Sequence, residues 1–174
     1  QRSCLNDQLG KKIGSSSLCL YDDPLVERGL SSRPFDGDGF ATKKRTIMED
    51  GILNMYFIDL YNSRRLGVTP TTGSTSNLVI PSTNVSREEI LSNSPKIISV
   101  EGFLGGNTNP ITGDFSFGIT GKYFENGEFV QGISEMNLSG NLFEMLERFQ
   151  TAANDTWTYG SYRVPSLLFD DMQF

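Results

Sequence analysis

Neighbouring carboxylates are the side chains of this sequence whose spacing could support acid–base chemistry. A glycosidase or aspartic-protease dyad requires two carboxylates that converge in space and have different pKa values. Adjacent carboxylates in turns more often cap helices or stabilise the turn, so we interpret these pairs as structural. The four pairs are Asp22/Asp23, Asp36/Asp38, Glu88/Glu89 and Asp170/Asp171.

The sequence of 174 residues contains no histidine. This excludes a Ser-His-Asp triad, a Cys-His dyad and a zinc helix of the HExxH type within these residues. No serine lies in a GxSxG or SxxK motif, and the glycine-rich segments match neither a P-loop nor a dinucleotide fingerprint. The DGDG segment at 36–39 is similar to the start of a calcium loop but lacks the later ligands and the closing glutamate. We therefore identify no catalytic residue and no metal ligand in this chain.

Charge and cysteine content limit the partners and the compartment. The net charge of −6 argues against a nucleic-acid partner, because phosphates would be repelled. The two cysteines, Cys4 and Cys19, are expected to be reduced thiols of a cytoplasmic protein. No apolar run approaches the roughly 20 residues of a membrane helix, and no signal peptide is visible, so we expect no membrane partner.

The elements that would position these residues are mostly strands, as 12 Phe, 6 Tyr and 18 Gly suggest. Period-two alternation of Phe115, Phe117, Ile119 and Tyr123, followed by Asn126-Gly127, predicts a hairpin. Capping-box residues and an apolar stripe predict one main helix at about 141–153. We also expect a hairpin at 42–58 with its turn at Asp50-Gly51, strands at 18–21 and 166–169, and a buried strand at 96–104. Two short helices are expected: one at 59–66 that ends at Gly67, and one at 86–91 that begins with a capping box of Ser86 and Glu89.

Read in order, these segments resemble the carboxyl-terminal domain of the TldD/PmbA family, known as modulators of DNA gyrase and as metallopeptidase subunits. The resemblance covers nearly the whole chain and rests on the order and spacing of several segments. It implies an α+β, β-rich fold with curved antiparallel or mixed sheets, one main helix and short helices. We expect residues 1–174 to form a single domain, a fragment of a longer protein that lacks its amino-terminal half. The segments are 5–13, 29–53, 61–68, 72–73, 112–128 and 139–155.

In this family, active members carry an HExxxH zinc helix just before the region where this chain begins, and a cysteine ligand near the carboxyl end. The corresponding segment here, TWTYGSYRV at 156–164, has no cysteine, and PFDGDGFATKKR at 34–45 is closer to the PmbA version. The resemblance therefore implies a non-catalytic subunit of the PmbA/TldE-like branch, with zinc expected only in a partner. That partner would be a TldD-like subunit, or a second copy in a dimer, and the substrate an unfolded or leader-bearing peptide.

Polar loops at 31–39, 69–77 and 105–114 are expected to rim a cleft or a subunit interface, and a sheet edge could hold an extended peptide by strand addition. Two alternatives remain open: a catalytic TldD-like member whose HExxxH helix lies upstream, and a purely structural or interaction domain. The candidate peptide- or partner-binding residues are Asp36, Asp38, Thr72, Ser74, Asn107, Thr112 and Asp114.

Overall fold

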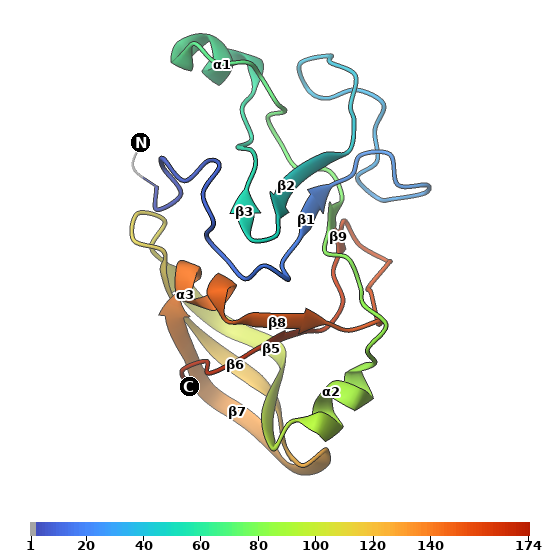
Figure 1. Ribbon diagram of the computed structural model, residues 1–174, viewed down its shortest axis with the longest axis vertical. Coiled ribbons are helices and arrows are strands. Elements are labelled where there is room, and N and C mark those ends of the chain that lie inside the picture. Colours follow the sequence, from blue (N-terminus) through green and yellow to red (C-terminus); the bar gives the residue numbers. More distant parts are fainter. Residues whose placement is uncertain (1–2) are drawn as a thin grey trace.

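The computed structural model describes residues 3–174 and shows a β-rich α+β fold with three sheets (Figure 1). The five-stranded sheet has the order β3-β2-β1-β4-β9, with β4 and β9 parallel and the other neighbours antiparallel. Its turn between β2 and β3 places Asp50 and Gly51 at positive φ, as the Asp-Gly signal predicts. The strands are β1 Leu20–Asp22, β2 Arg45–Glu49, β3 Ile52–Leu53, β4 Leu78–Val79 and β9 Tyr162–Arg163.

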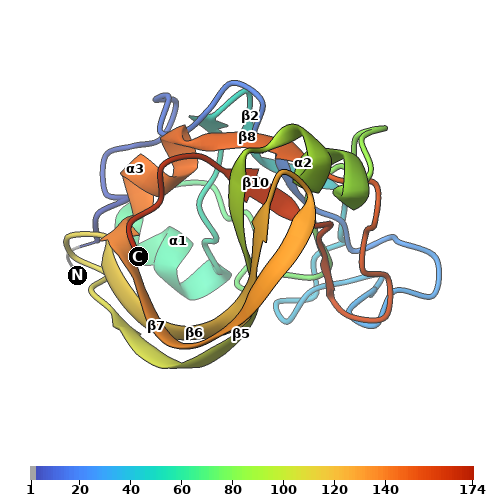
Figure 2. The same ribbon diagram turned by 90° about the horizontal axis from the view of Figure 1, so that it is seen from below.

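The second sheet consists of three long antiparallel strands: β5 Lys96–Thr108, β6 Asp114–Glu125 and β7 Glu128–Asn141. The predicted hairpin is confirmed, because Glu125 pairs with Glu128 across the Asn126-Gly127 turn. Bulges in both strand pairs increase the local bend of such a sheet. Figure 2 shows the resulting curved wall, with β8 and β10 on its open side.

Strands β8 Phe149–Ala152 and β10 Leu167–Phe169 form the third, two-stranded sheet. The prediction of one helix over 141–153 is therefore wrong in its second half. Helix α3 spans only Leu142–Glu147, and its N-cap Asn141 accepts a hydrogen bond from the Phe143 amide. The apolar stripe is real, but the backbone after Arg148 pairs with β10 instead of continuing the helix. Long-range strand pairing has overridden the local helical pattern.

The two other helices are short and lie close to the predicted ranges. Helix α1 spans Leu60–Leu66, with Asp59 as its N-cap and Gly67 in the left-handed conformation at its end. Helix α2 spans Arg87–Asn93 and begins with the predicted capping box of Ser86 and Glu89. Among residues 3–174 there is no helix long and apolar enough to cross a membrane.

The buried core lies between the five-stranded sheet and β8, whereas the curved sheet is less buried. The predicted strand at 96–104 exists, but it continues to Thr108, and Phe103 and Leu104 are 64% and 60% exposed. The expectation of a buried strand there is therefore wrong, because this half of β5 extends beyond the packed body. The predicted hairpin at 42–58 is also shorter, since β3 ends at Leu53. The core cluster contains Ile13, Leu18, Ile47, Met48, Leu53, Phe149 and Ala152.

Candidate functional site

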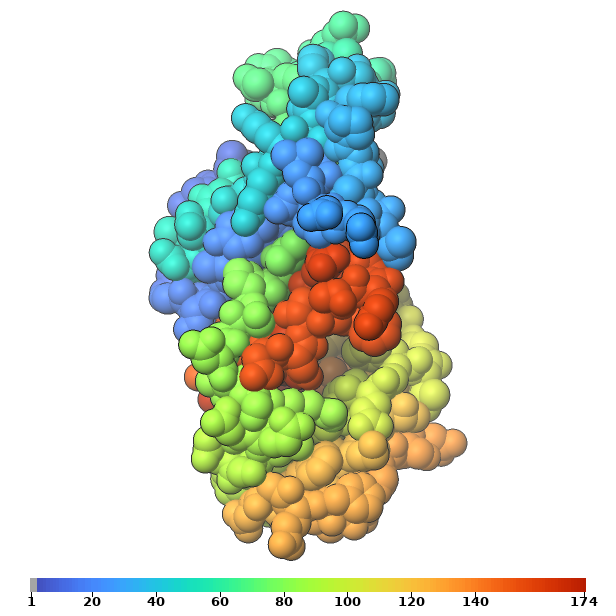
Figure 3. Space-filling model, turned by 90° about the vertical axis from the view of Figure 1, so that its right-hand side faces the viewer, coloured from blue at the N-terminus to red at the C-terminus, as the bar shows by residue number. Residues whose placement is uncertain are grey.

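A candidate site is a cavity of about 620 Å³ between the curved sheet, α2 and the carboxyl-terminal segment. This volume is typical of pockets that hold a small ligand or part of a peptide. Figure 3 shows a hollow on this side of the molecule, between the segment near the carboxyl terminus (red) and the curved sheet (yellow). The wall includes Ile90 and Leu91 of α2, Ile97, Ile98, Val100 and Phe103 of β5, and Leu167, Leu168 and Phe169 of β10.

The wall is mostly apolar because β5 and β10 both contribute apolar residues to it. Strand β5 has an additional property: within residues 3–174 it pairs with β6 alone, so its other edge has unpaired backbone groups. Phe103 lies on this wall and packs against Phe117 at 5.4 Å between ring centroids. The cavity therefore combines an apolar interior with an open strand edge.

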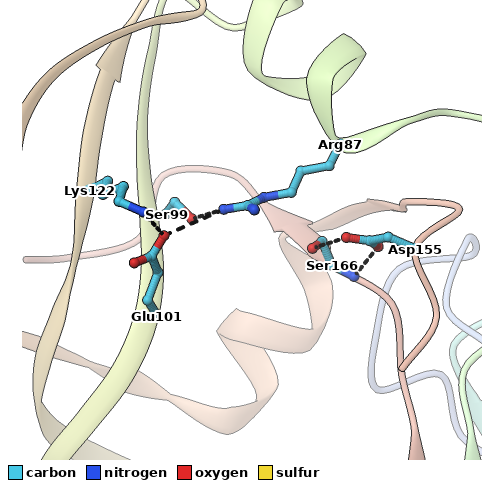
Figure 4. A network of polar contacts seen from close by, with 6 residues as sticks. All are labelled: Arg87, Ser99, Glu101, Lys122, Asp155 and Ser166. Atoms are coloured by element: carbon cyan, nitrogen blue, oxygen red, sulfur yellow. Dashed lines mark hydrogen bonds and ion pairs between the residues drawn. The ribbon is translucent and has the colours of Figure 1, made fainter. Parts of the chain in front are cut away.

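Polar residues form a network near the cavity (Figure 4). Arg87, the first residue of α2, donates from Nη2 to Ser99 Oγ at 2.9 Å and lies 3.7 Å from Glu101 Oε1. Lys122 approaches the same Glu101 oxygen more closely, at 2.9 Å. Arg87 thus connects α2 to strand β5 at the wall of the cavity.

Asp155 lies on the other side of Arg87 in this network (Figure 4). The Ser166 amide and hydroxyl donate to its two oxygens at 2.8 Å and 2.7 Å. Burial alone would raise the pKa of Asp155, but these hydrogen bonds, together with the charge of Arg87, outweigh it and lower the pKa. Asp155 is therefore an anion at neutral pH with both oxygens already bound.

Tyr123 brings a hydroxyl group to the cavity wall. Its hydroxyl donates to Glu125, and this hydrogen bond, with smaller effects of burial and of the Glu125 charge, raises the pKa of Tyr123. The hydroxyl therefore stays protonated at neutral pH. Across residues 3–174, no three His, Cys, Asp or Glu side chains are grouped so that they could hold a metal ion. The arrangement is suited to binding an apolar ligand.

Two of the predicted site residues lie in the loop before β2 and serve its turn. Asp36 is buried, and its Oδ1 accepts hydrogen bonds from the amides of Asp38 and Phe40, both at 3.0 Å. Asp38 is exposed, and its Oδ2 accepts from the Leu60 amide at 2.8 Å, which connects this loop to the start of α1. This carboxylate pair has the structural role expected of turn residues.

Thr72 and Ser74 belong to the neighbouring loop. Thr72 is buried, while Ser74 accepts two hydrogen bonds from Arg33 Nη2, one through its carbonyl and one through its hydroxyl, both at 3.0 Å. Arg33 comes from the loop that contains Asp36. The structure therefore brings Asp36, Asp38, Thr72 and Ser74 into one region around two adjoining loops and α1.

The remaining predicted residues lie elsewhere, at the connection of β5 and β6. Asn107 pairs opposite Ser116, so it belongs to a strand and not to the predicted loop. Asp114 accepts from Thr112 Oγ1 at 2.6 Å and from Asn141 Nδ2 at 2.8 Å, and these bonds lower the pKa of Asp114. Figure 1 shows this connection apart from the loops around α1. A role of the seven residues in binding stays a prediction.

Of the residues that the structure describes, the cavity wall includes none of those seven. Sequence reasoning missed the cavity because its wall comes from segments that are distant in the chain: 87–103, Tyr123, Leu138, Met145 and 166–174. The capping box at Ser86 was recognised, but it gives no sign that Arg87 reaches across to β5. Only the bend of the sheet brings these segments together.

The comparisons with known proteins place this fold among metallopeptidase domains. Residues 1–174 match the family described as the PmbA/TldA metallopeptidase C-terminal domain. The chain belongs to this PmbA/TldD family, as its sequence resemblance predicted. It is 34% identical over 171 residues to the metalloprotease PmbA of Escherichia coli O157:H7, covering 97% of this chain and 38% of that protein. It is 32% identical over 174 residues to a metalloprotease PmbA homolog of Haemophilus influenzae, and this match covers 98% of this chain and 39% of that protein.

Solved structures agree with this assignment. A putative modulator of DNA gyrase from Bacteroides thetaiotaomicron has a TM-score of 0.95 at 41% identity, covering 98% of this chain and 39% of that one. TldE from Thermococcus kodakarensis has a TM-score of 0.86 at 23% identity, and the match covers 97% of this chain and 42% of that one. At this identity the likeness shows the shared fold alone. The chain thus spans about two fifths of the length of the relatives that it matches.

Proposed function

We propose that this chain is a non-catalytic, PmbA/TldE-like subunit of a cytoplasmic zinc-dependent peptidase. It would act by pairing with a metal-bearing TldD-like subunit, and the substrates would be unfolded or leader-bearing peptides. The observation that carries the proposal is a missing ligand: this member of a metallopeptidase family has no cysteine in the segment 156–164, where the family resemblance places the cysteine ligand of active members. These 174 residues also contain no histidine, the commonest zinc ligand and the usual general base near neutral pH.

The geometry of β5 supports a role in holding peptides. An extended peptide can add to an unpaired strand edge through its backbone, without catalytic side chains on the protein. Strand β5 is 13 residues long, and within the described residues only β6 pairs with it. The apolar cavity lies beside its first half, where Ile97, Ile98 and Val100 contribute to the wall.

The test is reconstitution with a TldD-like subunit that carries the HExxxH motif. We expect the two proteins to co-purify and the mixture to cleave an unfolded peptide, while this chain alone leaves the peptide intact. Mass spectrometry of the peptide after incubation measures cleavage directly. Cleavage by the isolated, metal-free chain would refute the proposal.

The two alternatives predict different results. If the chain comes from a catalytic TldD-like protein, the encoded residues upstream of Gln1 will contain HExxxH, and a longer protein will cleave the peptide without a partner. If the chain is purely structural, titration with extended peptides will leave the amide resonances of the hairpin at 114–138 unmoved.

A further inference from the structure

We propose that the cavity beside β5 binds the carboxyl-terminal residues of a peptide, with apolar side chains inside and the terminal carboxylate at Arg87. This inference rests on the proposed role in peptide handling and specifies the kind of peptide. The ligand class is a peptide that ends in large aliphatic residues and has a free α-carboxylate. Two properties of the site support it: an apolar interior and an arginine with unused donors.

The interior selects apolar side chains because its wall offers them few polar partners. Ile98 and Val100 of β5 and Leu168 and Phe169 of β10 all line this volume of about 620 Å³. A cavity of this size exceeds the space that one aliphatic side chain requires, so two or three residues of a peptide fit. Transfer of aliphatic side chains from water into such a site is favourable.

Arg87 is suited to a carboxylate because most of its donors are free. Among the described residues, the only hydrogen bond of its guanidinium group goes from Nη2 to Ser99 Oγ. Glu101 is 3.7 Å away, but Lys122 is closer to it, at 2.9 Å, so the charge of Glu101 is shared between two cations. The side chain of Arg87 is 40% exposed, which leaves its planar donors accessible. Such donors match the two oxygens of a carboxylate.

The other charges at the cavity do not compete for this role. Both oxygens of Asp155 already accept hydrogen bonds from Ser166. Lys96 lies 3.9 Å from a glutamate and its side chain is 73% exposed, so it points largely to water. The side chain of Asp171 is 93% exposed. Of the two cations on the cavity wall, Arg87 is therefore the one that is suited to an anionic group.

A peptide fits better than a fatty acid, although both combine an apolar part with a carboxylate. Strand β5 contributes residues to the same wall, and its unpaired edge offers backbone donors and acceptors. A peptide backbone can use these groups, whereas a hydrocarbon chain cannot.

Fluorescence anisotropy of this chain with two labelled hexapeptides tests the inference. Both have the sequence Gly-Ser-Gly-Ser-Leu-Leu with fluorescein at the amino end; one ends in a free acid and the other in a carboxamide. We expect the acid to bind about 10-fold more tightly, the difference that one charge-assisted pair typically makes. Arg87→Met should remove this difference. Lys122→Met is the matched control: it also deprives Glu101 of a cation, but Lys122 is not part of the cavity wall, so the difference should persist.

Equal affinities of acid and carboxamide for the unmodified chain would overturn the inference, and this comparison requires no variant. The inference would also be overturned if neither peptide bound. It would be overturned as well if octanoate bound at Arg87 while the peptides did not. Cleavage by the reconstituted pair separates the two proposals. Cleavage without an acid preference refutes only the inference, whereas an acid preference without cleavage by any TldD-like partner refutes only the proposed function.

Discussion

Asp22 is the residue whose loss should destabilise the fold most clearly. It ends β1, is 1% exposed, and its Oδ1 accepts hydrogen bonds from the amide and the hydroxyl of Ser76 at 2.5 Å and 2.7 Å. Ser76 is itself buried, at 4% exposure. Asp22→Ala would leave both donors without an acceptor and without access to water. Each buried, unsatisfied donor costs about 1–3 kcal/mol, so we expect the free energy of unfolding to fall by about 3 kcal/mol.

Urea unfolding followed by circular dichroism measures this change, and Asp23→Ala is the matched control. Asp23 is the next residue, but its one side-chain hydrogen bond, from the Leu25 amide, lies at an exposed position where water can replace it. We expect the control to lose less than about 1 kcal/mol. Asp22→Asn retains an acceptor oxygen and should fall between the two, which gives a measurable variant if the alanine variant does not fold. Equal losses for the Asp22 and Asp23 variants would refute the reasoning.

Two further predictions concern Asp155 and the hairpin turn. The pKa of Asp155 lies below its ordinary value of 3.8, so its contribution to stability is present above that value and is lost as the pH falls through the lower folded pKa. NMR titration of the Asp155 carboxyl should show a higher pKa in Ser166→Ala and a slightly higher one in Arg87→Met; an unchanged midpoint in both would contradict this account. Gly127 has a φ of 82°, so Gly127→Ala should lower the free energy of unfolding by about 1 kcal/mol. Gly132→Ala is the control and should not lower it, because nothing lies within 4 Å of the added carbon. Equal melting temperatures of the two variants would contradict this prediction.

Features that depend on neighbours in sequence could be predicted. The turn at Asn126-Gly127, the capping box at Ser86 and the stop at Gly67 are each determined by a few adjacent residues, and the structure contains all three. The family could be predicted as well, because the order of such segments is preserved over nearly the whole chain. Local signals therefore predicted these turns and caps, and the family resemblance predicted the fold class.

Features that depend on distant contacts could not be predicted. The helical stripe at 141–153 continues through Phe149, but the backbone there forms a strand because Leu167–Phe169 offers a partner. The cavity likewise depends on the curvature of the sheet that contains β5, because its wall combines residues of β5 and β10 (Figure 2). No local pattern encodes that bend, which explains why the predicted loop residues and the cavity do not coincide.

The fold separates the part that provides stability from the part that offers a binding surface. The buried cluster packs between the five-stranded sheet and β8, whereas no residue of β5 is fully buried. Regions with few buried contacts are those in which proteins tolerate substitutions and adapt to ligands. Arg87 and the β5 side of the cavity wall belong to this second region, so substitutions there should change binding more than stability. The opposite is expected at Asp22, which joins β1 to the loop that contains Ser76 on the side of the core. The two classes of variant therefore report separately on the fold and on the site.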